Sequence, residues 1–376
     1  VKNIIFLLRN KTIYFLYRFI LKPVFFLFDP EKIHDLMTSV GKILGSTMVT
    51  RKLTAISFGY QNKKYLQQKI EGIIFENPMG LAAGFDKNAQ MIKIIPEVGF
   101  SFMEVGSITA KKCEGNEKPR LWRLKKSKGL AVYYGLRNNG SQEIHERIKK
   151  NKCKIPLGIS IAKTNCKEST SLEDGANDYL QTYHTFKDVG DYDVLNISCP
   201  NAFGGEYFTN PKYLEHLLEK VNKNRHKKPI FLKIPCDLPI GEIDEIIEIA
   251  TKYKVNGFIC TNLTKNRDNK KIKDAFVPEK GGLSGKIVED LANKIISHVY
   301  KKTGKKFTII GCGGIFSAED AYKKIKLGAS LLQLITGMIY EGPQLIGEIN
   351  LGLTDLLKKD KLSNISEAIG LSHKKP

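Results

Sequence analysis

The sequence contains few of the patterns that mark a metal centre or a disulfide-linked fold. Its seven cysteines are dispersed along 376 residues. No CxxC pair occurs among them, so neither a zinc knuckle nor a disulfide framework is indicated. The seven histidines form no HExxH motif or other ligand spacing. We therefore expect no metal site, and the cysteine pattern fits a reducing compartment.

Long uninterrupted apolar runs are also missing. Residues 4–28 are rich in Ile, Phe, Leu and Tyr, but basic residues interrupt them, so they fall short of the ~20 apolar residues that a spanning helix needs. A signal peptide fits poorly, because no small-residue cleavage site precedes Asp29. Asp29 and Pro30 can begin a second helix that extends to about Leu44. Two such helices fit an amphipathic hairpin in the headgroup region of a membrane; the alternative is a hairpin packed on the main domain.

Acidic residues are scarce relative to basic ones. The chain has 60 Lys and Arg against 39 Asp and Glu, which gives a formal net charge of +21. Such a balance can indicate a nucleic acid or an anionic membrane surface as a partner. The lysines are scattered, however, and no arginine-rich arm occurs. We therefore favour a general bias of composition and expect no nucleic-acid partner.

The main body alternates short apolar runs with helix-like segments. Eight runs are typical of buried strands: Met79–Ala83, Phe102–Gly106, Leu157–Ile161, Val194–Ser198, Ile230–Ile234, Gly257–Thr261, Thr308–Gly311 and Leu331–Thr336. Intervening segments have helical apolar spacing, as in Pro211–Lys223, Ile240–Tyr253, Ile287–Tyr300 and Ala318–Leu327. Eight strand–helix units predict a (β/α)8 TIM barrel, an α/β fold. Residues 113–124 and 262–283 break the alternation, and we expect loops over the C-terminal face there.

Polar and glycine residues follow nearly every predicted strand. The stretch Asn196–Asn201 places two amides, a hydroxyl and a thiol at one strand end. A thiol can take a proton, and amides can hold a planar polar ring. Because catalytic residues of such barrels come from the C-terminal ends of strands, this stretch is a candidate active site. Glycines at 311, 313, 314 and 337 end the last two strands, where backbone N–H groups can approach a phosphate.

At these residues the chain resembles dihydroorotate dehydrogenase, a family of FMN-dependent (β/α)8 barrels, over about residues 11–370. The resemblance is carried by Asn77–Asn88, Gly115–Asn116, Lys118–Arg120, Asn196–Asn201, Gly281–Gly285 and the two C-terminal glycine sites. The N-terminal hairpin with Phe28–Glu31 is similar to class 2, the membrane-associated members that reduce a quinone.

The resemblance implies FMN as cofactor and a role for each matching residue. Lys233 would lie near the electron-rich edge of the flavin, where a cation stabilises the reduced anion. The implied cofactor-binding residues are Ala82, Ala83, Gly84, Lys87, Gly106, Ser107, Ser160, Asn196, Lys233, Thr261, Ser284, Gly285, Gly313, Gly314, Thr336 and Gly337. The implied substrate-binding residues are Lys87, Gly135, Leu136, Asn196, Asn201 and Asn262. Cys199 would be the base that removes the C5 proton of dihydroorotate while hydride passes from C6 to flavin N5.

The chain departs from the family pattern at several positions. Cys199 stands where class 2 members carry Ser; Cys is typical of class 1, the soluble members. Val132 replaces an Asn that binds orotate, which should weaken binding by about 1–3 kcal/mol unless Arg137 or Asn138 compensates. Ser160 replaces a flavin-contacting Asn. Leu263 replaces a usual Thr beside Asn262. Ile335 replaces a Tyr that is common near the quinone tunnel in some class 2 members, and Arg123 matches an Arg that lines this tunnel.

These features favour a dihydroorotate dehydrogenase of pyrimidine (UMP) biosynthesis that passes electrons to a membrane quinone. Residues 1–48 would form a membrane- and quinone-associated extension, and residues 49–376 the FMN-binding barrel. The protein would lie on the cytoplasmic face of the cell membrane. The alternatives are a cytoplasmic enzyme with a soluble acceptor such as fumarate, a flavin barrel that reduces another pyrimidine such as uracil in tRNA, and a flavin-binding or membrane-scaffold protein with a decayed site. The sequence does not indicate the oligomeric state.

Overall fold

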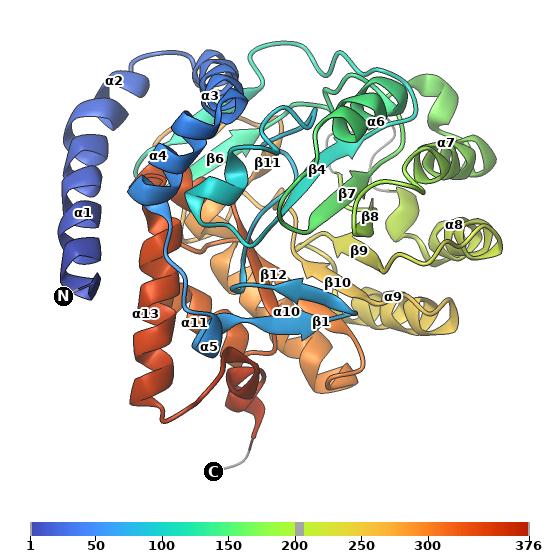
Figure 1. Ribbon diagram of the computed structural model, residues 1–376. Helices are drawn as coiled ribbons and strands as arrows, with labels where there is room; N and C mark the ends of the chain where they lie inside the picture. The colour runs from blue at the N-terminus through green and yellow to red at the C-terminus, as the bar shows by residue number, and fades with distance from the viewer. Residues whose placement is uncertain (1, 200–206, 375–376) are drawn as a thin grey trace.

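A closed barrel of eight parallel strands forms the centre of the molecule. The computed structural model describes residues 2–199 and 207–374 (Figure 1), and the strands pair in the closed order β10-β12-β13-β3-β4-β7-β8-β9. Their bounds are β3 Met79–Leu81, β4 Phe102–Ile108, β7 Leu157–Ile161, β8 Tyr192–Asn196, β9 Ile230–Ile234, β10 Gly257–Cys260, β12 Thr308–Cys312 and β13 Leu331–Leu334. The predicted (β/α)8 barrel is confirmed.

Helices surround the barrel between successive strands. They are α6 Ser141–Lys150, α7 Leu172–Thr185, α8 Pro211–Lys223, α9 Ile240–Lys252, α10 Glu289–Thr303, α11 Ala318–Lys326, the short α12 Thr336–Glu341 and α13 Leu345–Lys359. The connection from β3 to β4 instead carries the 3-10 helix η2 (Ile95–Val98). The N-terminal helix α4 (Met48–Phe58) packs against η2, and so covers this part of the barrel.

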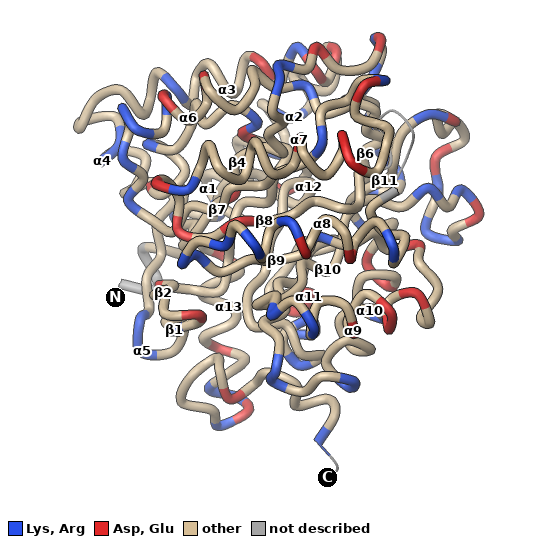
Figure 2. Tube along the Cα trace, turned by 90° about the vertical axis from the view of Figure 1, so that its right-hand side faces the viewer, with Lys and Arg blue, Asp and Glu red and all other residues tan. Residues whose placement is uncertain are grey.

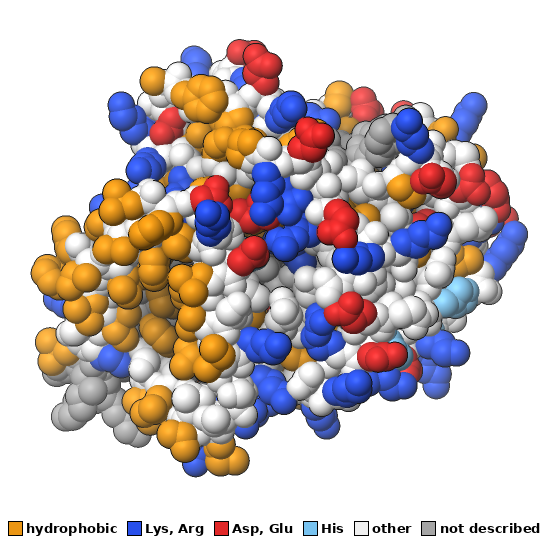
Figure 3. Space-filling model, turned by 90° about the horizontal axis from the view of Figure 1, so that it is seen from above, with side chains coloured by type: hydrophobic (Ala, Val, Ile, Leu, Met, Phe, Trp, Pro, Cys, Tyr) orange, Lys and Arg blue, Asp and Glu red, His pale blue; other side chains and the backbone are white. Residues whose placement is uncertain are grey.

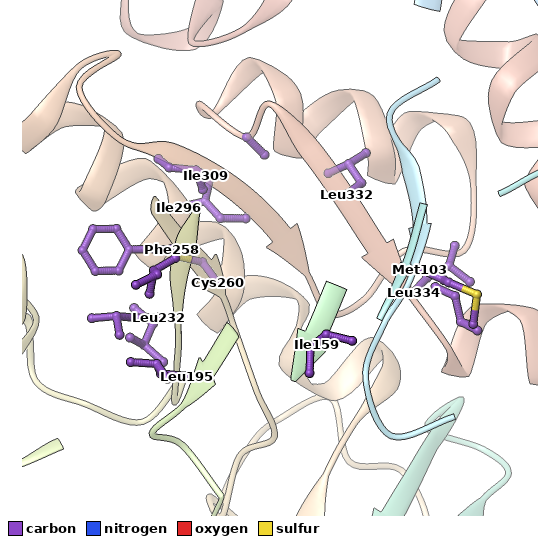
Figure 4. Packing of buried hydrophobic residues seen from close by; sticks show 14 of the residues in the cluster. Met103, Ile159, Leu195, Leu232, Phe258, Cys260, Ile296, Ile309, Leu332 and Leu334 are labelled. Atoms are coloured by element: carbon purple, nitrogen blue, oxygen red, sulfur yellow. The ribbon is translucent and has the colours of Figure 1, made fainter. Parts of the chain in front are cut away.

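The core has two layers, one between strands and helices and one inside the barrel. Figure 4 shows the first layer, in which Leu232 and Phe258 of the strands lie near Ile296 of α10. Inside the barrel, large rings fit against glycines: a Cβ on Gly158 would lie 2.4 Å from the ring of Tyr192. The hairpin of β1 (Gln68–Ile70) and β2 (Ile73–Phe75) adds Phe75 to this inner layer.

A small antiparallel sheet stands where the sequence predicts only loops. It has the order β11-β6-β5, with β5 Leu121–Leu124, β6 Gly129–Val132 and β11 Gly282–Leu283. The prediction of loops over 113–124 and 262–283 is therefore wrong for residues 121–124 and 282–283. Because β11 has two residues, no alternation pattern could reveal it.

The N-terminal region forms more helix than the sequence predicts. Its elements are α1 Lys2–Leu16, the π-helix η1 Tyr17–Leu21, α2 Lys22–Phe25, α3 Pro30–Ser46, α4 Met48–Phe58 and α5 Lys63–Leu66. Asp29 caps α3, as predicted, by accepting from the backbone N–H of Lys32 at 2.9 Å. The Tyr17 hydroxyl donates to the carbonyl of Ile339 at 2.7 Å, and Lys22 donates to that of Tyr340 at 2.8 Å. These bonds hold the N-terminal region against α12.

The surface carries scattered charge and one apolar face. Lys and Arg alternate with Asp and Glu along the helices (Figure 2), whereas hydrophobic side chains gather over the N-terminal helices (Figure 3). Exposed members of this N-terminal apolar face are Leu7, Leu8, Phe15, Phe19, Ile20, Val24, Leu27, Phe28, Leu36, Ile43, Met48, Val49, Leu53 and Ile56. Among the described residues, no helix has the length and apolarity to cross a membrane.

Candidate active site

Two adjoining hollows lie at the C-terminal ends of the barrel strands. The amide hollow is lined by strand ends that include Asn196 and Asn262, by β6, and by His34 of α3. The glycine hollow lies beside it, over β10, β12 and β13. Residues that line both are Ala83, Lys233, Asn262, Leu263, Ser284, Ile335 and Thr336. The two hollows therefore adjoin, with these residues as their shared wall.

Glycines let the backbone around the glycine hollow pack closely. A Cβ on Gly337 would lie 2.1 Å from the carbonyl oxygen of Ile315, and one on Gly314 would lie 2.7 Å from Cα of Glu289. Gly313 and Gly314 have φ values of 106° and 78°, which side-chain-bearing residues rarely adopt. Bare backbone at the ends of the seventh and eighth strands of such a barrel suits a phosphate group.

A chain of hydrogen bonds fixes the polar groups of the amide hollow. The Asn196 amide donates to Ser107 Oγ at 2.7 Å, and Ser107 Oγ lies 2.8 Å from Ser160 Oγ. Ser198 Oγ donates to Asn196 Oδ1 at 2.8 Å, and the Asn262 amide donates to Ser198 Oγ at 2.9 Å. Strands β4, β7, β8 and the end of β10 are thereby linked, and the two amides have fixed orientations.

Cys199 is half-buried in the wall of the amide hollow, directly after β8. The buried Lys163 lies near it. Burial lowers the pKa of Lys163, whereas the thiols of Cys166 and Cys199 and the carboxyl group of Asp178 act to raise it. A nearby cation favours a thiolate. Asn201 lies outside the described residues.

Lys87 is half-buried where α3 meets the barrel. Its Nζ lies 3.3 Å from His34 Nε2 and 4.0 Å from the centroid of the Tyr134 ring. Burial, followed by the charge of Arg137, lowers the pKa of Lys87 to about 8. Burial and then Lys87 lower the pKa of His34 well below its ordinary value. The imidazole is therefore neutral at pH 7, and Lys87 carries the charge.

Lys233 reaches the shared wall of both hollows from β9 and is 4% exposed. Glu104, on β4, is buried inside the barrel. Burial raises the pKa of Glu104, while the charge of Lys233 opposes the rise. Glu104 also accepts hydrogen bonds from Gln333 and from Tyr192. Buried charges of opposite sign thus lie beneath the hollows.

The turn after β6 forms the side of the amide hollow opposite the strand ends. Gly135 and Leu136 have φ values of 63° and 59°, and both line the hollow together with Val132. Asn138 is turned away from it. Its amide donates to Thr109 Oγ1 at 2.8 Å and to the carbonyl of Leu136 at 2.7 Å. Asn138 therefore does not supply the donor that Val132 lacks.

The structure brings nearly all of the predicted site residues together. Every described one lines a hollow except Ser160, which lies behind Ser107. Sequence reasoning missed His34, Lys163, Tyr134 and an apolar wall made by Leu121, Leu130 and Ile339. His34 had no signal beyond its place in a predicted helix. Arg123, expected near a quinone tunnel, donates to the carbonyl of Phe28 at 2.7 Å. In residues 2–199 and 207–374, no group of three or more His, Cys, Asp or Glu side chains could hold a metal ion.

Comparisons with known proteins give a consistent result. Residues 65–357 match the sequence model of a family described as "Dihydroorotate dehydrogenase". A "Dihydroorotate dehydrogenase (quinone)" of Trichodesmium erythraeum is 37% identical over 96% of this chain and 99% of its own length. A protein of the same name from Haloarcula marismortui is 38% identical over 80% of this chain and 83% of its own. The crystal structure of DHODH in complex with ferulenol from Eimeria tenella superposes with a TM-score of 0.80 at 29% identity, covering 92% of this chain and 96% of that one.

Proposed function

The chain belongs to the dihydroorotate dehydrogenase family, and we propose that it oxidises dihydroorotate to orotate, a step in the synthesis of UMP, with FMN in the glycine hollow. The observation that carries this proposal is the shared wall of the two hollows. A space suited to a phosphate lies directly beside two oriented amides, a lysine and a thiol. These groups are the ones that a cofactor-dependent oxidation of a planar heterocycle needs.

The residues of the glycine hollow fit FMN. Gly313, Gly314 and Gly337 would hold its phosphate, because they line the hollow with bare backbone. Further contacts would come from Ala82, Ala83, Gly106, Ser107, Thr261, Ser284, Gly285 and Thr336. When bound, FMN would supply a two-electron acceptor beside the amide hollow.

The residues of the amide hollow would bind and deprotonate the substrate. Asn196 and Asn262 would hold the polar edge of the ring, since the hydrogen bonds through Ser198 fix their amides. Cys199, as a thiolate, would take the proton from C5 and become a neutral thiol. Lys163 would favour the thiolate through its charge. Lys87, half-buried and cationic, would attract the anionic substrate into the hollow.

A membrane quinone is the proposed electron acceptor. Leu121, Leu130, Ile335 and Ile339 give the amide hollow an apolar wall, and His34 extends it to α3. An apolar wall suits a quinone better than it suits fumarate, which is a dianion. The names of the relatives from Trichodesmium and Haloarcula also support this acceptor. Cys199, which stands where soluble members of the family carry Cys, favours fumarate as the second candidate.

The N-terminal apolar face would place the protein on a membrane. Leu27, Val49 and Ile56 are 82%, 68% and 69% exposed, and α3 connects this face to the amide hollow through His34. A peripheral position on the cytoplasmic face of the cell membrane would let a quinone pass from the lipid to the hollow. Membrane binding would come from burial of this apolar face in the lipid, together with attraction of Lys and Arg to anionic lipids.

An anaerobic mixing experiment tests the function. Purified protein loaded with FMN is mixed with dihydroorotate, and the visible absorbance of the flavin is followed. Bleaching is expected, and a quinone should then restore the colour faster than fumarate. A flavin that dithionite reduces but dihydroorotate does not would overturn the proposed substrate. Faster recovery with fumarate would overturn the proposed acceptor alone.

A further inference from the structure

Arg137 lies near Val132 and can replace the missing donor without giving up a buried hydrogen bond. Val132 lines the amide hollow with a side chain that cannot donate. Asn138 is 1% exposed, and its amide donates to Thr109 and Leu136 while its oxygen accepts from Gly140. Arg137 lines the same hollow as Val132, and its side chain is 39% exposed.

We propose that Arg137 is a substrate-binding residue that pairs with the carboxylate of the pyrimidine. The assignment rests on the proposed function and specifies how that site recognises an anionic ring. A guanidinium presents a planar fork of donors that matches a carboxylate. Its Nη1 donates to Glu31 Oε1 at 3.1 Å and lies 3.4 Å from both carboxylate oxygens of Asp35. Within the described part of the chain, Nη2 and Nε donate to no other residue, so they are available to a ligand.

The turn that carries Arg137 is fixed before any ligand arrives. Asn165 Nδ2 donates to the carbonyl of Gly135 at 3.0 Å. A Cβ on Gly135 would lie 2.4 Å from Asn116 Oδ1, so the turn packs closely against residue 116. The backbone of Cys113 also pairs with that of Asn138 through two bonds of 3.0 Å. A preorganised turn lowers the entropy that binding would otherwise cost.

The charges of the pocket also indicate an anionic ligand. Lys87 and Arg137 both line the amide hollow, and Arg137 is the second cause, after burial, of the lowered pKa of Lys87. Two cations that face one space repel each other until an anion enters it. Glu31 and Asp35, both on α3, offset part of this repulsion, and both contact Arg137 through Nη1. A carboxylate in the hollow would therefore be attracted by both cations.

The test is the affinity of the FMN-loaded protein for orotate, measured by calorimetry. Arg137→Ala should raise the Kd by about 10- to 100-fold, since a hydrogen bond to a charged group is lost. Arg137→Lys keeps the charge, so it should lose less affinity for orotate than Arg137→Ala does. Arg137→Ala combined with Val132→Asn should recover part of the affinity. Lys118→Ala is the matched control: Lys118 lies 3.8 Å from Glu31 in the same ion cluster and is 66% exposed, so the Kd should change less than about twofold.

The outcomes separate this assignment from the proposed function. If the wild-type protein binds orotate and dihydroorotate bleaches its flavin, but Arg137→Ala keeps the wild-type Kd, the assignment is overturned and the function stands. An equal loss of orotate affinity in Lys118→Ala would also overturn the assignment, because the effect would then come from removing a positive charge and not from losing a specific contact. If Arg137→Ala does not fold, Arg137→Lys is compared with the double variant Arg137→Lys, Val132→Asn. Equal Kd values of these two variants would contradict the proposal. A wild-type protein that neither binds orotate nor bleaches would overturn the function itself.

Discussion

Replacing Cys199 tests the proposed proton transfer at a single atom. Cys199→Ala removes the base but leaves the hydrogen bonds among Asn196, Ser198 and Asn262 in place. We expect orotate binding to persist while the rate of flavin reduction by dihydroorotate falls about 10²–10⁴-fold at neutral pH. Cys199→Ser should retain some activity, with a pH optimum above that of the wild type. Stopped-flow absorbance measures both rates, and full activity of Cys199→Ala would remove Cys199 as the base.

Lys87 gives orotate binding a dependence on pH. Its pKa is lowered to about 8, chiefly by burial and then by Arg137, and the protonated form is the one that attracts an anion. In the ligand-free protein, Lys87 loses its proton as pH rises through about 8. Above this pH, orotate binding must therefore be accompanied by uptake of a proton at Lys87. The Kd should therefore rise by up to about tenfold per pH unit above that point.

The comparison variant for this effect is Lys87→Met, which has no titrating group. Its Kd for orotate should be weaker at pH 7 and nearly constant up to about pH 9.5. A wild-type Kd that stays flat over the same interval would contradict the assigned role of Lys87, because the neutral amine would then bind orotate as well as the cation does.

At the scale of elements, α3 is joined to the barrel by a buried ion pair. Glu31, on α3, is 4% exposed and accepts from Arg120 Nη2 at 2.8 Å, and Arg120 is 5% exposed. Burial acts to raise the pKa of Glu31, but the hydrogen bond and charge of Arg120 lower it overall. The contribution of Glu31 to stability is therefore present above its ordinary pKa and is lost as pH falls.

Glu31→Ala should destabilise the fold strongly, because Arg120 would remain buried without its partner. We expect a loss of about 3–5 kcal/mol in the free energy of unfolding, measured with a chemical denaturant. Asp35→Ala serves as the control on the same helix. Asp35 is 51% exposed and lies 3.4 Å from Arg137, so its loss should cost less than about 1 kcal/mol. Equal losses of unfolding free energy in Glu31→Ala and Asp35→Ala would mean that burial of the Glu31–Arg120 pair does not determine its contribution to stability.

The barrel strands could be predicted from the sequence, whereas the elements that cover the site could not. Parallel strands buried on both faces give continuous apolar runs, and β7 and β9 match the predicted ranges residue for residue. The strand β8 begins and ends two residues earlier than predicted, since Ser198 bonds back to Asn196 Oδ1 and turns the chain. Helix α4 was not predicted, although Val49, Leu53 and Ile56 recur at helical spacing, and all three point to the surface.

The candidate site was predictable where topology determines it. Strand ends of a barrel meet at one face, so the glycines and amides of β8, β10, β12 and β13 had to converge. The environment of Arg137 was not predictable in this way. Its partner Glu31 lies 106 positions away on a helix outside the barrel, and no pattern in the sequence links the two. The boundary predicted at residue 48 between extension and barrel stays a prediction.

At the scale of the whole molecule, the N-terminal apolar face predicts binding to lipid vesicles. Val49→Glu together with Ile56→Glu places two charges on exposed positions of this face, and we expect sedimentation with anionic vesicles to fall at least about tenfold. Flavin reduction by dihydroorotate should not change, because neither residue lines a hollow. Ile74→Glu, 54% exposed on β2, is the control and should bind vesicles as the wild type does. Unchanged sedimentation of the double variant would place the membrane contact elsewhere.

The bond from Tyr17 to the carbonyl of Ile339 has a consequence for biogenesis. The two residues are 322 positions apart. During translation at about 5–20 residues per second, the first helices therefore leave the ribosome tens of seconds before their docking site exists. Throughout that interval their hydrophobic side chains have no folded partner. Chaperones or a nearby bilayer would have to shield them, so the nascent chain can reach the membrane before the barrel closes.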